Sequence, residues 1–338
     1  MPFSLAELAL PILGAPMAGG PSSPALVAAV SEAGGLGNLA AGYLTARRLV
    51  DDIAAVRALT AGPLGVNLLV PQPCVATARQ LDRFRDRLMP LAQRLGVEPG
   101  RPGPDDDDWQ AKLDVIADMA PEAVSFTFGC PGPRVLARLR DRGVLTMVTV
   151  TSREEADLAV RSGAEALVVQ GPSAGGHRGV FDADRAPPEL PLDLLLAETI
   201  GAGVPVVAAG GIGDDLAVGA ALDRGAVAAQ VGTALLLADE AGTNPVHRRA
   251  LRDTQFTETV VTRAFSGRYA RGLANDFAAR HSSAAPPGYP QVNQITGPIR
   301  AASVAVGDPH AASLWAGTSW RATTSGPAAD IVARLAGR

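Results

Sequence analysis

Short apolar runs of β type alternate with amphipathic helical stretches through the first two thirds of this 338-residue chain. Most of the runs are almost continuously apolar, which is typical of parallel strands that are covered by helices. Eight of them are found, at residues 12–15, 36–40, 64–70, 123–128, 145–150, 166–170, 204–209 and 227–231. Such a chain can form a doubly wound open sheet, but eight repeats favour a closed α/β fold, the (β/α)8 TIM barrel.

Residues that begin and end helices support these boundaries. Ser152 and Glu155 form a capping-box pattern ahead of an amphipathic stretch, and Gly163 stands where that helix should end. Gly225 ends the next amphipathic stretch in the same way. We therefore expect helices over residues 152–162 and 214–224, between successive strands.

Two parts of the chain do not follow the repeat. Residues 74–108 contain an extra helical pattern and end in the acidic run Asp105–Asp108, which we interpret as a solvated linker. Residues after 243 have a mixed helical pattern with a proline- and glycine-rich stretch over Pro286–Pro298. The sequence therefore predicts a barrel over residues 1–243 with an inserted helical segment at 74–108. A C-terminal extension, residues 244–338, is expected to pack on the barrel near its mouth.

The stretch from Gln170 to Gly179, QGPSAGGHRG, follows the sixth predicted strand and is the most informative in the chain. Active sites of α/β barrels lie at the C-terminal ends of the strands. The glycine pair lets the backbone pass close to a ligand and presents His177, and a histidine is a natural general base near neutral pH. The other histidines, His247, His281 and His310, lie outside such loops. A structural histidine is the alternative, but we expect His177 to be catalytic.

Glycine-rich loops follow the seventh and eighth predicted strands, at Ala208–Asp214 and Gln230–Thr233. Loops at these two positions form the usual phosphate site of α/β barrels, where N–H groups of a helix N-terminus bind the anion. A phosphorylated ligand is therefore expected, and FMN is the simplest choice. No GxGxxG fingerprint of a dinucleotide site is found at a strand-to-helix turn.

Two further strand ends could contact a flat ligand. Small residues over Gly14–Gly20 would let backbone amides approach it, and Asn67 can both donate and accept hydrogen bonds at a flavin edge. Either feature is also common in ordinary turns.

Composition excludes several classes of function. The formal net charge is -4 and the pI is about 5.6, which gives no footprint for nucleic acids or anionic membranes. Cys74 and Cys130 are isolated, so we expect neither a metal site nor a disulfide. No signal peptide and no apolar run of about 18 residues is found, so a cytoplasmic location is expected. The oligomeric state is left open, a homodimer included.

Several separate segments resemble the bacterial and fungal nitronate monooxygenases, in one order from Pro11 to about Trp320. In the barrel they are 15–19, 33–37, 65–67, 170–179, 208–212 and 230–233. In the extension they are 265–268, 270–271, 289–290, 296–298 and 314–317. The resemblance implies an FMN-dependent oxidation of alkyl nitronates by O2 to a carbonyl compound and nitrite.

The same resemblance assigns roles to individual residues. His177 would be the base, which removes the α-proton of a neutral nitroalkane and helps to position an already ionised nitronate. FMN would be held by Ala15, Pro16, Met17, Asn67, Gln170, Gly175, Gly211, Gln230, Val231, Gly232 and Thr233. Gly211 and the last four of these residues would bind its phosphate.

Two departures from the family pattern concern the substrate. Ser173 stands where the family usually has Glu, and Thr318 where it often has Gln. Other enzymes with the Ala-Gly-Gly-His loop remain alternatives, namely FMN-containing enoyl-thioester reductases and NAD(P)H:quinone reductases. A flavin-binding sensor is a third interpretation, although a sensor needs no base.

Overall fold

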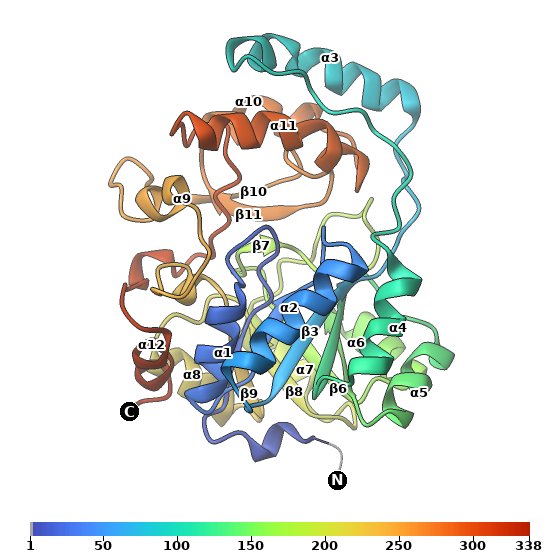
Figure 1. The fold of residues 1–338 in the computed structure, drawn as a ribbon, viewed down its shortest axis with the longest axis vertical. Helices are drawn as coiled ribbons and strands as arrows, with labels where there is room; N and C mark the ends of the chain where they lie inside the picture. Colours follow the sequence, from blue (N-terminus) through green and yellow to red (C-terminus); the bar gives the residue numbers. More distant parts are fainter. Residues whose placement is uncertain (1–2) are drawn as a thin grey trace.

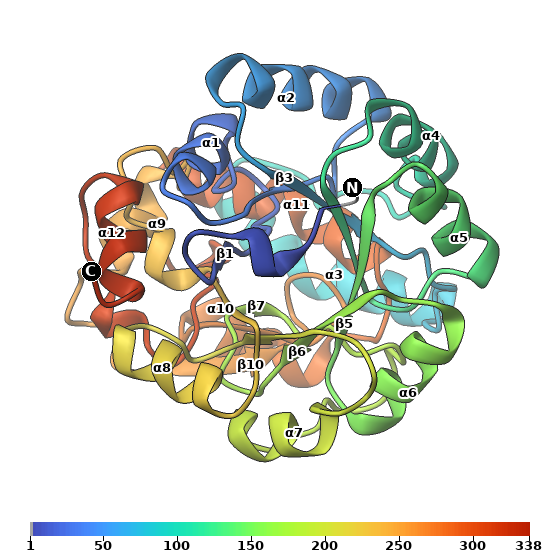
Figure 2. The ribbon, with the colours of Figure 1, turned by 90° about the horizontal axis from the view of Figure 1, so that it is seen from below.

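Eight parallel strands form a ring at the centre of the molecule, in a computed structural model that describes residues 3–338. Their order around the ring is β1-β9-β8-β6-β5-β4-β3-β2. A bridge between Leu13 and Leu36 joins the two outer members, so the ring closes (Figures 1 and 2). The strands are β1 (Ile12–Gly14), β2 (Gly37–Ala40), β3 (Leu64–Leu69), β4 (Ala123–Thr127), β5 (Leu145–Val150), β6 (Ala166–Gln170), β8 (Val206–Ala209) and β9 (Ala228–Val231). The predicted (β/α)8 TIM barrel is confirmed, and all eight predicted strands are present.

Helices cover the outside of the ring, as Figure 2 shows from below. They are α1 (Pro24–Glu32), α2 (Ala46–Leu59), α4 (Trp109–Met119), α5 (Pro133–Asp141), α6 (Arg153–Ser162), α7 (Leu192–Thr199), α8 (Asp215–Asp223) and α12 (Ala328–Leu335). No helix within residues 3–338 is long and apolar enough to cross a membrane.

The predicted capping box of α6 forms only in part. The Ser152 hydroxyl accepts the Glu155 N–H, as the pattern requires. The Glu155 carboxylate does not return to Ser152, because it accepts the N–H groups of Thr151 and Phe181 at 2.6 and 2.8 Å. Glu155 therefore ties the start of α6 to the segment that follows His177.

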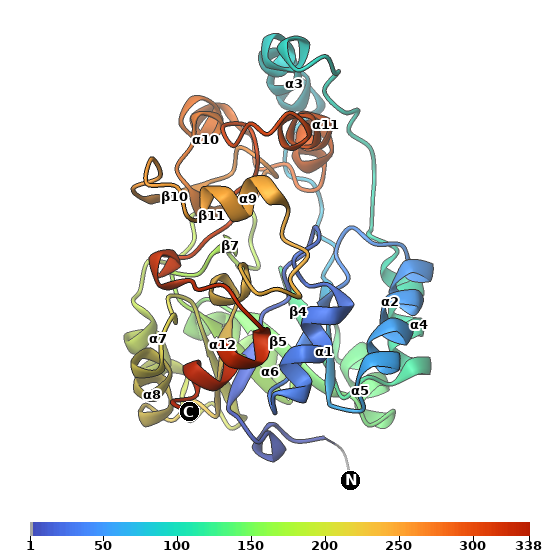
Figure 3. The ribbon, with the colours of Figure 1, turned by 60° about the vertical axis from the view of Figure 1, so that its left-hand side comes forward.

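A second layer, which we call the cap, lies over one end of the barrel (Figures 1 and 3). It comprises α3 (Ala78–Arg94), β7 (Gly176–His177), α9 (Pro245–Ala250), β10 (Thr259–Thr262), β11 (Ala270–Leu273), α10 (Asp276–His281) and α11 (Gln291–Ala305). In the described chain as a whole, barrel included, short 3-10 helices lie at Leu5–Glu7, Thr233–Leu235, Ser282–Ala284 and Trp320–Ala322. The cap has its own apolar core, in which Phe84 of α3 and Ile295 of α11 are buried. The inserted segment and the C-terminal extension thus form one body.

Helix α11 runs through most of the proline- and glycine-rich stretch Pro286–Pro298. The helix begins at Gln291 and continues through Pro298. A proline inside a helix leaves the carbonyl of the residue four positions earlier without its usual N–H donor. That carbonyl, on Gln294, faces Gly100 of the inserted segment, where a Cβ would lie only 2.1 Å from the oxygen. Gly100 also donates its N–H to Ile295 O at 2.9 Å, so the insertion docks where the proline interrupts the helix.

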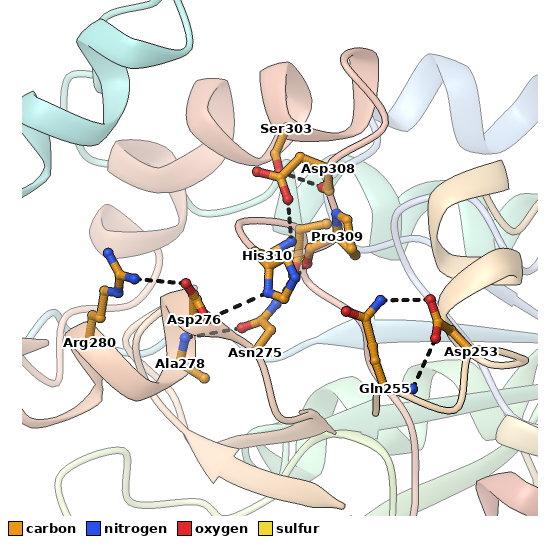
Figure 4. A network of polar contacts seen from close by, with 11 residues as sticks. Asp253, Gln255, Asn275, Asp276, Ala278, Arg280, Ser303, Asp308, Pro309 and His310 are labelled. Atoms are coloured by element: carbon orange, nitrogen blue, oxygen red, sulfur yellow. Dashed lines mark hydrogen bonds and ion pairs between the residues drawn. The ribbon is translucent and has the colours of Figure 1, made fainter. Parts of the chain in front are cut away.

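A polar network inside the cap joins α10 to the segment after α11 (Figure 4). Asp276 pairs with Arg280 at 2.8 Å, and its second oxygen lies 3.6 Å from His310 Nδ1. Asp308 accepts the His310 N–H at 2.8 Å, and Ser303 donates to the Asp308 carbonyl at 2.6 Å. These contacts connect α10 with the segment that follows α11.

The last helix, α12, leaves the cap and returns to the outer wall of the barrel, beside α1 and α8 (Figure 3). Its side chains Ile331, Val332 and Leu335 are buried in the main barrel core. The C-terminal extension therefore contributes both to the cap and to the barrel.

We expect Ile331→Ala to lower the free energy of unfolding by about 2–5 kcal/mol, because it removes buried methyl groups from that core. Urea unfolding followed by circular dichroism measures the change. Asp330→Asn, on the exposed face of the same helix, is the control and should change stability by less than about 0.5 kcal/mol. Equal stabilities of the two variants would show that α12 is not part of the barrel core.

Candidate active site

A cavity of about 480 Å³ lies between the C-terminal ends of the barrel strands and the cap. Barrel loops form its floor, and Arg300 and Asn293 of α11 line its cap side. All of the sequence-predicted site residues line this one cavity, namely Ala15, Pro16, Met17, Asn67, Gln170, Gly175, His177, Gly211, Gln230, Val231, Gly232 and Thr233. Their convergence follows from the parallel ring, since parallel strands place all their carboxyl ends at the same end of a barrel.

His177 lies in the two-residue strand β7, which pairs with β11 of the cap. The side-chain amide of Gln170 holds this strand from below, because its Nε2 donates to His177 O at 3.0 Å and its Oε1 accepts the Gly179 N–H at 2.8 Å. The hydroxyl of Ser266 lies 2.7 Å from His177 Nε2. One ring nitrogen is thereby fixed, and Nδ1 has no hydrogen-bond partner within residues 3–338. Nδ1 is therefore the atom that can act on a substrate.

The imidazole of His177 is enclosed by three aromatic side chains. Ring centroids of Phe128, Tyr289 and Trp315 lie 5.5, 6.2 and 5.5 Å from its own. Burial, together with the positive charges of Arg268 and Arg300, lowers the pKa of His177 from its ordinary value of 6.5 to about 3. The ring is therefore neutral near pH 7 and can accept a proton.

Two arginines make this part of the cavity electropositive. Arg300 lines the cavity and is fixed by Asn293, whose side-chain oxygen lies 2.7 Å from Nη2, and by Thr296. Arg268 is fully buried, with its guanidinium 3.9 Å from the centroid of the Phe128 ring. No Asp or Glu side chain of residues 3–338 lines the cavity. The site is therefore suited to bind an anion.

The glycine loops after β8 and β9 meet a segment that the phosphate prediction did not include. Thr233 Oγ1 accepts the N–H of Gly317, at 2.9 Å, just before the 3-10 helix Trp320–Ala322. Gly317 and Ser319 line the cavity beside Gly211 and Thr233. Three backbone turns with small residues thus surround one end of the cavity, as an anion held by N–H groups requires.

The polar side chains on the barrel floor differ in their free hydrogen-bonding capacity. The Gln230 amide makes no hydrogen bond to residues 3–338 and is fully available to a ligand. Asn67 Nδ2 is engaged by Ser125 and Thr127 of β4. Both atoms of the Gln170 amide are occupied by the His177 loop. Gln170 therefore positions β7, in addition to any contact that it makes with a cofactor.

Sequence reasoning missed several cavity residues. Tyr43, His247 and Arg300 line the cavity, although no motif marks them as site residues. His247 is 4% exposed, and burial lowers its pKa to about 4. Arg300 and His247 come from the cap, so only tertiary packing brings them to the barrel mouth. Trp315 was within a recognised segment, but its contact with His177 was not predicted.

The two departures from the family pattern lie side by side. The Thr318 N–H donates to Ser173 O at 3.1 Å. A Cβ on Gly211 would lie 2.8 Å from the Ser173 Cβ and 3.8 Å from Thr318 Oγ1. Both departures therefore adjoin the glycine loop after β8.

Two cavity histidines, the half-buried His177 and the buried His247, make stability depend on pH. The pKa of His177 is about 3 and that of His247 about 4 in the folded protein, against 6.5 in the unfolded chain. Between pH 4 and pH 6.5 the unfolded chain therefore binds more protons than the folded protein. The free energy of unfolding should be fully retained above pH 6.5 and fall as the pH drops towards 4. His247→Gln should reduce this slope in urea unfolding between pH 4 and 7. An unchanged slope in a folded His247→Gln protein would contradict the lowered pKa of His247.

Known proteins with related sequences and structures identify the family. The nitronate monooxygenase family model matches residues 4–337. A probable nitronate monooxygenase of Staphylococcus aureus is 36% identical over 330 residues, which cover 96% of this chain and 93% of that protein. The crystal structure of nitroalkane oxidase from Streptomyces ansochromogenes superposes with a TM-score of 0.94 at 44% identity, covering 98% of this chain and 96% of that one. FabK from Thermotoga maritima superposes with a TM-score of 0.76 at 26% identity, covering 98% and 93%. This chain belongs to the nitronate monooxygenase family.

Proposed function

We propose that the protein is an FMN-dependent enzyme that oxidises alkyl nitronates with O2 to a carbonyl compound and nitrite. The observation that carries the proposal is a neutral His177 whose free Nδ1 lies in a cavity with Arg300 and without carboxylates. A nitronate is an anion, and a nitroalkane becomes one when it loses its α-proton. The family membership and the similarity to nitroalkane oxidase support the same reaction class.

The residues of the cavity fit FMN. Gly211 and residues 230–233 would hold the phosphate, because the glycine loops that contain them border one end of the cavity. Ala15–Met17 and Asn67 would lie along the ring system. When bound, FMN supplies the redox chemistry between the nitronate and O2.

The protein's own side chains would prepare the substrate. His177 Nδ1 accepts the α-proton of a neutral nitroalkane, and a low pKa does not prevent this, because Arg300 stabilises the nitronate that is formed. Ser266 keeps the imidazole oriented through Nε2, and Gln170 keeps the loop in place. Phe128 and Trp315 exclude water, which strengthens the attraction between the arginine and the anion. With a preformed nitronate no proton has to be removed, and His177 acts by positioning.

A reductase is the second candidate, because the Ala-Gly-Gly-His loop at Ala174–His177 also resembles that of FMN-containing enoyl-thioester reductases. Anaerobic mixing with NADH or NADPH separates the two. Rapid loss of flavin colour would favour a reductase, whereas loss of colour with a nitronate alone would favour the monooxygenase.

The cofactor assignment predicts that the purified protein is yellow and releases FMN, not FAD, on heating. Gly232→Glu should abolish flavin retention, because a carboxylate would stand beside the site proposed for the phosphate. Gly219→Glu is the matched control, since Gly219 lies on α8 with no heavy atom within 4 Å of the position of its Cβ, and it should keep the flavin. The readouts are the absorption spectrum and thermal unfolding. A folded Gly232→Glu protein with full flavin content would contradict the placement of the phosphate.

The catalytic assignment predicts that His177→Asn lowers kcat/KM for neutral nitroalkanes by about 10²–10⁴-fold, with flavin retained. Activity on preformed nitronates should fall less, because no C–H proton has to be removed. Oxygen consumption with nitroethane and with ethyl nitronate measures both. His281→Asn, in the core of the cap, is the control. Equal losses of activity on both substrates would show that His177 acts by binding alone. No loss on either substrate would show that His177 takes no part in the reaction.

A further inference from the structure

Tyr43 occupies the rim of the cavity. It follows β2 in the loop that leads to α2, lines the cavity, and is nevertheless 42% exposed. Its side chain is a neighbour of Tyr289, since each tyrosine shifts the pKa of the other, and Tyr289 belongs to the cap and packs against Phe128 and His177. Tyr43 and Tyr289 therefore connect a barrel loop to the cap across the mouth of the cavity.

The backbone of Tyr43 is held in an unfavourable conformation. The Leu44 N–H donates to Ala41 O at 3.2 Å, which closes a turn with Gly42 and Tyr43 at its centre. Tyr43 has a φ of 69°, in the left-handed region where a turn of this kind normally has glycine. The glycine of this turn comes one residue earlier, where a Cβ would lie 2.7 Å from Leu69 Cδ1. A bulky residue is thus kept where glycine would fit without strain.

The inserted segment holds this turn from outside. Asp107 Oδ1 accepts the Tyr43 N–H at 2.9 Å, and Asp108 Oδ2 accepts the N–H of Ala46, the first residue of α2, at 3.0 Å. The other oxygen of Asp107 lies 2.8 Å from the ammonium group of Lys112, which is 1% exposed. The acidic run is exposed at Asp105, Asp106 and Asp108, as expected of a solvated linker, but the carboxylates of Asp107 and Asp108 also fasten the insertion to the cavity rim.

We propose that Tyr43 selects substrates by size and that Asp107 and Lys112 position it for this task. The inference rests on the proposed function, since the substrate is taken to be a nitronate. With the nitronate group between His177 Nδ1 and Arg300, Phe128 and Trp315 close two sides of the pocket. A long alkyl chain would extend towards the rim, where the Tyr43 side chain lines the cavity and narrows its mouth. The site therefore favours short-chain nitronates.

The test compares kcat/KM for ethyl nitronate and for hexyl nitronate in the FMN-loaded full-length enzyme. Tyr43→Gly removes the ring and suits the left-handed turn, so we expect the hexyl-to-ethyl ratio to rise at least tenfold, through a lower KM for the hexyl compound. Asp107→Ala should raise the hexyl-to-ethyl ratio as well. Asp107→Asn retains the acceptor for the Tyr43 N–H, so its ratio should equal that of the parent enzyme. Asp106→Ala is the matched control, because Asp106 is exposed and its side chain makes no hydrogen bond to residues 3–338.

A second readout does not depend on turnover. Trp315 lines the cavity, so acrylamide should quench more of the tryptophan emission in Tyr43→Gly than in the parent protein or in Asp106→Ala. An unchanged hexyl-to-ethyl ratio in a folded Tyr43→Gly protein would overturn the proposal. If the parent enzyme oxidised neither nitronate, the proposed function would fail, and the quenching comparison would then decide whether Tyr43 closes the mouth. Unchanged quenching in that case would overturn the proposal as well.

Discussion

Closure of the parallel ring is the constraint on which the rest of the structure depends. Once β1 and β2 are joined through Leu13 and Leu36, all eight strands end at the same rim. Loops that are more than 200 residues apart in the chain, such as those with Met17 and Thr233, then line one cavity. The ring also explains why glycine recurs at the rim, since backbones that converge on a small area leave little room for side chains.

The cap turns this open rim into a protected site. It is built from the insertion and the C-terminal extension, which meet where Gly100 docks on α11 beside Pro298. The cap supplies Tyr289, Arg300 and Trp315, and their packing buries His177 and lowers its pKa. Removal of water has two linked effects there, because it keeps the imidazole neutral and strengthens the arginine's attraction for an anion. A neutral imidazole and a positively charged guanidinium can then lie close together in one cavity.

Interactions between loop and cap explain how the histidine stays in place. Strand β7 contains only Gly176 and His177, too few residues to be stable alone. It persists because Gln170 binds its backbone from the barrel and β11 pairs with it from the cap. The His177 side chain is therefore held where the barrel and the cap meet.

The sequence by itself determined the barrel, its strand positions and the cavity floor. Those elements are local, because apolar periodicity, helix caps and glycine at strand ends depend on neighbouring residues, and a parallel ring then places the loops together. The helix through Pro298 was not foreseen, since local rules disfavour it and only Gly100 of the insertion accommodates it. Arg300 and Tyr43 were missed for the same reason, and the fastening role of the acidic run was not foreseen because Lys112 and the turn at Tyr43 become partners of Asp107 only on folding. Tertiary structure alone decided these contacts, because they join segments whose mutual distance no local pattern encodes.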